Sequence, residues 1–295
     1  MTFAWLSLGV LLGCAIFLLV VLSLYYADRV IRQPRETHPD ELRKYGLSGN
    51  NITFYARDGV KLIGMFFPGI NGATIILLHG FSRSKEQMLP QAAFLHKAGY
   101  SVLMFDFRAS GESGGKYITF GVKEQYDLES AIRYLKNRPE INKDRIGVFG
   151  FSMGGAVAIL KGSDIPEIKA YVINSAFSHM SEVIKKNFHE YLPHIPFYPF
   201  GYIALLYIRM RTGAYFPHIN PVQSISRLSS RPILLIHGAR DEIIPSHQAR
   251  ELARSSTGNV ELWEIPGADH HGAYTSARDE YERRVLSFFS QHLLM

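Results

Sequence analysis

Short runs of apolar residues alternate with helix-like patterns through most of this chain. The apolar runs cover residues 73–78, 101–105, 145–149, 169–173, 232–236 and 260–265. Amphipathic patterns lie between them, for example around residues 126–135 and 155–161. Short, fully apolar strands separated by helices are typical of a parallel sheet that helices cover on both faces. The pattern therefore predicts a doubly wound α/β fold.

The first strands follow a different pattern. Residues 51–56 and 61–67 read as two strands joined at Arg57-Asp58-Gly59, and Asp-Gly is a strong hairpin signal. We expect an antiparallel hairpin at one edge of the sheet. Residues 28–50 mix prolines, glycines and charges with little periodicity and are predicted to form a linker, which leaves residues 51–295 as the globular domain.

The N-terminal segment is continuously apolar. No residue from Phe3 to Tyr26 is charged, and a helix of that length reaches about 36 Å, against about 30 Å for a bilayer core. Trp5 at one end and Tyr25 and Tyr26 at the other are expected at the two membrane interfaces. A cleaved signal peptide and a buried core helix are the alternatives. The missing basic start and the long apolar run favour a retained transmembrane helix over residues 1–27.

Charge asymmetry predicts the orientation of this helix. Only the terminal amine precedes the span. Five basic residues follow it: Arg29, Arg32, Arg35, Arg43 and Lys44. By the positive-inside rule, the protein is a single-pass membrane protein whose globular domain is cytoplasmic. The lipid bilayer is thus an expected partner.

Composition excludes several other classes. The net charge is +6, but acids are scattered among the basic residues and no motif combines basic and stacking side chains, so no nucleic acid is expected as a partner. Cys14 is the single cysteine, so neither an intrachain disulfide nor a thiolate metal cluster can form. We expect neither a metal nor a cofactor.

One pentapeptide carries the first chemical signal. Gly150-Phe151-Ser152-Met153-Gly154 lies between a predicted strand and a predicted helix, the context in which a tight turn exposes a nucleophilic serine. Side chains at 150 and 154 would collide in such a turn. Gly111-Glu112-Ser113-Gly114-Gly115 fits the same pattern, but a polar loop surrounds it. Context therefore favours Ser152 over Ser113.

A serine nucleophile needs a base, and the base needs a carboxylate to orient it. In a parallel sheet such partners are expected in loops just after strands. Asp241 follows the strand at 232–236, and His270 follows the strand at 260–265. We predict Ser152 as nucleophile, His270 as base and Asp241 as the acid that orients it.

Residues from about 51 to 290 resemble an α/β-hydrolase. The matching motifs are Leu78-His79-Gly80-Phe81, the segment from Asp106 to Gly114, the Ser152 pentapeptide, His237-Gly238 with Asp241 and Pro245, and Gly267-Ala268-Asp269-His270. With its N-terminal anchor, the chain is similar to the single-pass branch that includes protein depalmitoylases and lysophospholipid or monoacylglycerol hydrolases. The resemblance implies that Phe81 and Met153 supply the oxyanion-hole NH groups, and that residues 106–114 form a structural loop.

Several neighbours compete for these roles. His271 is the alternative base, and Asp269 and Glu242 are alternative acids that would need another loop path to reach the imidazole. His79 is expected to shape its loop. His247 and His292 fall at a helix start and a helix end and are read as surface or core residues.

An aromatic insertion is expected to cover the site. Residues of about 177–225 separate two predicted strands and are rich in aromatic side chains. We interpret them as a cap whose rings build an apolar acyl pocket; packing of the cap onto the body is the alternative. The candidate pocket residues are Phe188, Tyr191, Phe197 and Phe200.

Together these features predict a membrane-anchored serine hydrolase of carboxylic esters, with fatty-acyl esters or thioesters favoured as substrates. A serine peptidase of the prolyl-oligopeptidase or aminopeptidase type shares the serine turn and is one alternative. A non-catalytic binding protein on a hydrolase fold is the other. The complete set of Ser152, Asp241 and His270 argues against that last interpretation.

Overall fold

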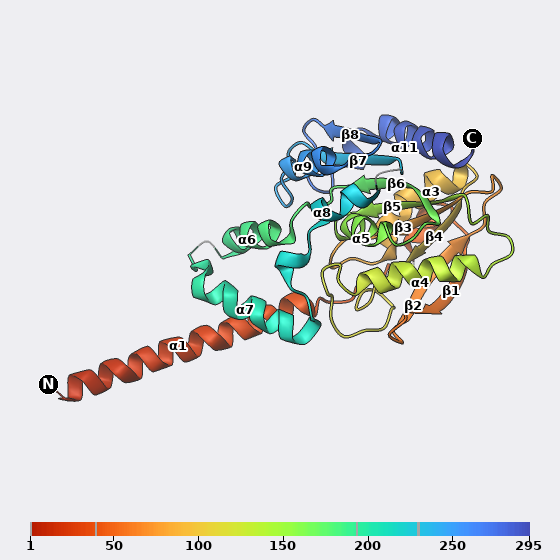
Figure 1. Cartoon of the computed structure of the whole chain (residues 1–295). Coiled ribbons are helices and arrows are strands. Elements are labelled where there is room, and N and C mark those ends of the chain that lie inside the picture. Colours follow the sequence, from red (N-terminus) through yellow and green to blue (C-terminus); the bar gives the residue numbers. More distant parts are fainter. Residues whose placement is uncertain (1, 39, 193, 229–230) are drawn as a thin grey trace.

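The computed structural model describes residues 2–38, 40–192, 194–228 and 231–295 (Figure 1). Within these residues one eight-stranded sheet has the order β1-β2-β4-β3-β5-β6-β7-β8. Its strands are β1 (Asn50–Tyr55), β2 (Lys61–Phe67), β3 (Thr74–Leu78), β4 (Ser101–Phe105), β5 (Ile146–Phe151), β6 (Ile168–Asn174), β7 (Ile233–Gly238) and β8 (Val260–Ile265).

The strands pair as the sequence predicts. β1 and β2 form the antiparallel edge hairpin, with Tyr55 opposite Lys61 on either side of the Asp58-Gly59 turn. β2 also pairs antiparallel with β4, and every pairing from β4 through β3 to β8 is parallel. All residues of β3, β4, β5 and β7 are buried, as expected for strands covered on both faces.

Helices cover both faces of the sheet. The α-helices are α1 (Thr2–Ile31), α2 (Glu41–Lys44), α3 (Leu89–Lys97), α4 (Glu124–Lys136), α5 (Met153–Gly162), α6 (Met180–Tyr191), α7 (Phe197–Thr212), α8 (Pro221–Ile225), α9 (His247–Ser255), α10 (Ala273–Ser276) and α11 (Arg278–Leu293). Three short 3₁₀ helices are η1 (Lys85–Met88), η2 (Phe216–His218) and η3 (Ser226–Leu228). Apolar residues of α4, α5, α8 and α9 pack on one face, and those of α3, α10 and α11 pack on the other.

Helix α1 extends further than predicted. It projects from the body as a long rod, and its C-terminal end lies beside α7 (Figure 1). Its segment Trp5–Ile31 is long and apolar enough to cross a membrane, by length and composition. The sequence assigned residues 28–50 to a linker, but the helix continues to Ile31 and α2 forms within that stretch. The stretch predicted as a linker is therefore partly helical.

The end of α1 is part of the hydrophobic core. Ala27 and Ile31 are fully buried in an apolar cluster with residues of α6 and α7. The backbone NH of Ile118 donates to the carbonyl of Ile31 at 3.0 Å, and the hydroxyl of Tyr207 donates to Asp28 Oδ1 at 2.8 Å. Burial and hydrogen bonds from two separate segments thus fix this helix on the body.

The insertion between β6 and β7 lies where the sequence predicts it. It contains α6, α7, η2 and α8, and α6 and α7 stand on the same side of the body as α1 (Figure 1). Phe177, Met180, Ala204 and Ile208 bury their side chains in the cluster that holds the end of α1. The insertion and the N-terminal helix therefore form one substructure beside the carboxyl ends of the strands.

Candidate active site

Ser152 occupies a strained turn between β5 and α5. Its φ of 52° and ψ of −117° are unusual for a residue with a side chain. A Cβ at Gly154 would lie 2.3 Å from the carbonyl oxygen of Leu78, and one at Gly150 would lie 2.6 Å from that of Gly154. Both glycines are thus required for close approach of the chain, as the sequence predicts.

The structure brings Ser152, His270 and Asp241 together from three loops. His270 Nε2 lies 3.1 Å from Ser152 Oγ, and His270 Nδ1 lies 2.7 Å from Asp241 Oδ2. All three residues are buried. They follow β5, β7 and β8, whose carboxyl ends meet at one edge of the sheet. The arrangement can move a proton from the serine to the imidazole while the carboxylate fixes the ring.

Asp241 is held as a carboxylate by its surroundings. Its Oδ1 accepts hydrogen bonds from the backbone NH groups of Ile243 and Ile244 at 3.0 and 2.7 Å. His237 Nε2 lies 3.2 Å from its Oδ2. Burial alone raises the pKa of Asp241, but the hydrogen bonds from His237, His270 and Ile244 outweigh it and lower the pKa to about 2. The acid therefore stays charged at neutral pH.

The competing residues make other contacts. Glu242 is exposed, and Asp269 Oδ1 accepts from the backbone NH groups of His271 and Gly272, which shapes the loop. The ring of His271 packs against Phe151 and His270. Burial, followed by electrostatic interactions with His270 and Arg83, lowers the pKa of His271. In the described part of the chain no cluster of three His, Cys, Asp or Glu residues has the arrangement of a metal site.

His79 and Ser113 have structural contacts. The buried ring of His79 donates from Nδ1 to the carbonyl of Gly80 at 2.8 Å and accepts at Nε2 from the NH of Phe107 at 2.9 Å. Burial lowers its pKa, consistent with a neutral ring. Ser113 Oγ donates to the carbonyl of Asp106 at 2.7 Å and accepts from the NH of Ile63 at 2.8 Å. Both side chains are fully engaged in their loops.

Phe81 and Met153, the residues predicted to form an oxyanion hole, lie on either side of Ser152 in the fold, after β3 and at the start of α5. Phe81 follows β3, and Met153 is the first residue of α5, so its NH lies at the positive end of the helix dipole. Both line the same cavity as Ser152 and His270. Gln87 Oε1 accepts from the NH of Gly80 at 2.7 Å and holds the Phe81 loop in place. Among the described residues no acceptor is found for either NH.

A cavity of about 610 Å³ opens at Ser152. Phe188 and Phe197 line it, and their rings pack edge to face with centroids 5.1 Å apart. Phe200 does not line it: it is buried behind Phe188 and against Tyr26, with ring centroids 5.6 and 6.1 Å away. The side chain of Tyr191 lies outside the described part of the structure. The aromatic cap thus both lines the cavity and packs onto the body.

Several cavity residues were not predicted from the sequence. Tyr26 and Val30 of α1 line it, although Tyr26 was expected at a membrane interface. Arg83 and His271 line it as well. Contacts between α1 and the cap depend on distant segments, so no local pattern marks them. His237 was noted only as part of a motif; its position four residues before Asp241 was the available signal.

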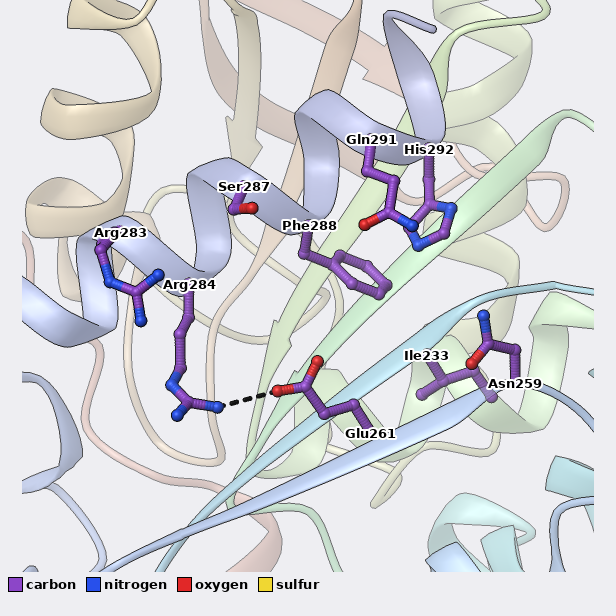
Figure 2. A pocket seen from close by; sticks show the side chains of 9 residues that line it. All are labelled: Ile233, Asn259, Glu261, Arg283, Arg284, Ser287, Phe288, Gln291 and His292. Carbon is purple, nitrogen blue, oxygen red and sulfur yellow. Dashed lines mark hydrogen bonds and ion pairs between the residues drawn. The ribbon is translucent and has the colours of Figure 1, made fainter.

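A second, smaller cavity of about 320 Å³ lies between α11 and strands β7 and β8 (Figure 2). Arg284 and Glu261 form an ion pair of 2.9 Å there. Its residues Ile233 and Asn259 stand at the start of β7 and just before β8. It therefore lies at the opposite edge of the sheet from Ser152 and does not belong to the same site.

Comparison with known proteins identifies the family. Residues 87–295, more than half of the chain, match the prolyl oligopeptidase family. The chain belongs to this family. This prolyl oligopeptidase family member is also similar to the esterase Pf2001 from Pyrococcus furiosus, at 32% identity and a TM-score of 0.75 over 90% of this chain and 98% of that one.

Two curated relatives of this family member are similar along most of its length. The protein YfhR of Escherichia coli O157:H7 is 28% identical over 85% of this chain and 84% of its own length. The thiohydrolase aneE of Aspergillus aculeatus is 24% identical over 83% of this chain and 93% of its own. With the sheet topology described above, these similarities make the protein a hydrolase of the α/β-hydrolase fold.

Proposed function

We propose that the protein is a membrane-anchored serine hydrolase of carboxylic esters. The observation that carries the proposal is the chain of contacts from Ser152 Oγ through His270 to Asp241, at 3.1 and 2.7 Å. Similarity to an esterase and to a thiohydrolase supports ester or thioester substrates. The resemblance to the single-pass branch of lipid and palmitoyl hydrolases points in the same direction.

In the proposed mechanism Ser152 Oγ attacks the acyl carbonyl carbon as His270 Nε2 takes its proton. The carbonyl π electrons move to oxygen, and the backbone NH groups of Phe81 and Met153 bind the oxyanion. Loss of one such donor typically costs about 2.7–4 kcal/mol of transition-state stabilisation. His270 then gives the proton to the departing alcohol or thiol. Water, deprotonated by His270, releases the acid from Ser152.

The chemistry is tested with a fluorophosphonate probe, which phosphonylates activated serines. Wild-type protein is expected to be labelled, and Ser152→Ala is expected to lose the label. Ser113→Ala provides the matched control because Ser113 lies in the second copy of the motif, and its label should persist. Undiminished labelling of Ser152→Ala would reject the proposal.

Peptide hydrolysis is the second candidate, because the matched family carries the name of a peptidase. The two functions are separated by a substrate pair that shares one acyl group, a nitrophenyl ester and the corresponding nitroanilide. We expect faster turnover of the ester than of the amide relative to their uncatalysed rates. Preferential acceleration of the amide would favour the peptidase.

Retention of α1 as an anchor is supported by its packing. A signal peptide is removed from the mature protein, whereas Ala27 and Ile31 are fully buried in the body. Arginines after the span favour a cytoplasmic body. Carbonate extraction and protease protection of closed vesicles test this proposal. The full-length chain should remain with the membrane, and its body should be digested only from the cytoplasmic side.

A further inference from the structure

The cavity at Ser152 has walls from three separate parts of the chain. The catalytic wall contains Phe81, Ser152, Met153 and His270. The other walls come from the cap helices α6 and α7 and from the last turns of α1. The helix that is long enough to span a bilayer is therefore in direct contact with the space in front of the nucleophile.

Two residues of α1 face this space. Tyr26 and Val30 both line the cavity, and their spacing of four residues places them on the same side of the helix. Their neighbours Ala27 and Ile31 are fully buried against the body and hold this side of the helix in position. The wall made by α1 is thus fixed by packing.

Helix α7 forms the neighbouring wall. Gly201, Ala204, Leu205 and Ile208 on its inner side line the cavity. Its outer side carries exposed apolar side chains at intervals of four residues, Tyr202, Leu206 and Met210, and in its last turn the exposed Arg209. A helix with apolar side chains on both sides and arginines in its last turn is typical of the interface between a bilayer and water. Since α7 lies beside the apolar helix α1 (Figure 1), its outer side suits the surface of the same bilayer.

We propose that α1 is both anchor and specificity element: Tyr26 and Val30, with the inner side of α7, bind the acyl chain of a long-chain fatty-acyl ester supplied by the bilayer. This inference rests on the proposed esterase function. The cavity volume of about 610 Å³ lies within the usual range for small-molecule sites and leaves room for an extended apolar chain. Each buried methylene group is expected to raise kcat/KM about fourfold.

The test makes the side chain at position 30 larger in one variant and smaller in another. Val30→Phe shortens the site and Val30→Ala enlarges it, and both are assayed as full-length protein in nanodiscs with nitrophenyl esters from acetate to palmitate. We expect Val30→Phe to exclude about two methylene groups of a long acyl chain from the cavity. The value of kcat/KM for laurate, divided by that for acetate, should therefore fall about tenfold. Val30→Ala is expected to shift the optimum to longer chains.

Val21→Phe is the matched control. Val21 is 42% exposed, and its spacing of nine residues from Val30 places it on the opposite side of α1. This variant should keep the wild-type chain-length profile. Unchanged profiles in both Val30 variants, or an equal shift in Val21→Phe, would overturn the role of α1. Absence of Ser152-dependent hydrolysis for every ester would instead reject the proposed function.

Discussion

His237 Nε2 lies 3.2 Å from Asp241 Oδ2 and 2.8 Å from the carbonyl oxygen of Ile244. Its NH is therefore placed between the acid of the site and the backbone of the loop that carries it. His237 is buried, and its Nδ1 has no hydrogen-bond partner among the described residues. We interpret His237 as a residue that positions Asp241.

Replacing His237 by Phe should change both activity and acid stability. Loss of a hydrogen bond to a charged group is expected to lower kcat/KM about tenfold to a hundredfold. The pKa of Asp241 should rise from about 2 toward its ordinary value. Because its ionisation stabilises the folded state above the unfolded pKa near 4 and loses this effect as the pH falls toward 2, the variant should unfold at a higher pH.

Circular dichroism recorded from pH 6 to pH 2 measures the pH midpoint of acid unfolding. His247→Phe is the control, because His247 is an exposed histidine in the same region. An acid midpoint of His237→Phe equal to that of the control would contradict the positioning role.

Asp241→Asn should preserve the fold and remove most of the activity. The amide cannot fix the ring of His270 in the tautomer that accepts the serine proton, and the expected loss in kcat is about ten-thousandfold. Hydrolysis of a short nitrophenyl ester measures it. Glu242→Gln, at the neighbouring exposed acid, should retain wild-type activity. A comparable loss in both variants would assign the effect to the loop and not to the carboxylate.

Ile31→Ala should destabilise the hydrolase body, although the residue lies at the end of the apolar helix. Ile31 is fully buried, and truncation of a buried Ile typically costs about 2–5 kcal/mol of unfolding free energy. Chemical denaturation in detergent measures the change. Ile16→Ala makes the same substitution on the same helix at a 53% exposed position. Equal stabilities for the two variants would show that the end of α1 does not pack on the body in solution.

Leu206→Glu should reduce hydrolysis of esters embedded in vesicles more than hydrolysis of a soluble acetate ester. Leu206 is 58% exposed on the outer side of α7, where a charge is unfavourable in an apolar surrounding. Ile70→Glu is the control, because Ile70 is equally apolar and 94% exposed between β2 and β3, away from the cap. If both substrates respond alike, the outer side of α7 does not contact lipid.

The sheet and the grouping of Ser152, Asp241 and His270 were predictable because their signals are local. Buried parallel strands are short apolar runs, and the carboxyl ends of such strands converge at one edge. The positions of Tyr26 and Phe200 were not predictable. Each depends on which helix packs against it, and α1 and α7 are separated by more than 150 residues in the sequence. Aromatic composition identified the cap but not which rings face the cavity.

Helix α1 runs without interruption from Thr2 into the body, where Ile31 accepts a hydrogen bond from Ile118. In the proposed orientation no hinge separates the lipid from the nucleophile. The continuous helix then fixes the distance of Ser152 from the membrane surface. Such an enzyme selects its substrates by how deeply their ester bonds lie in the lipid as well as by their chemistry.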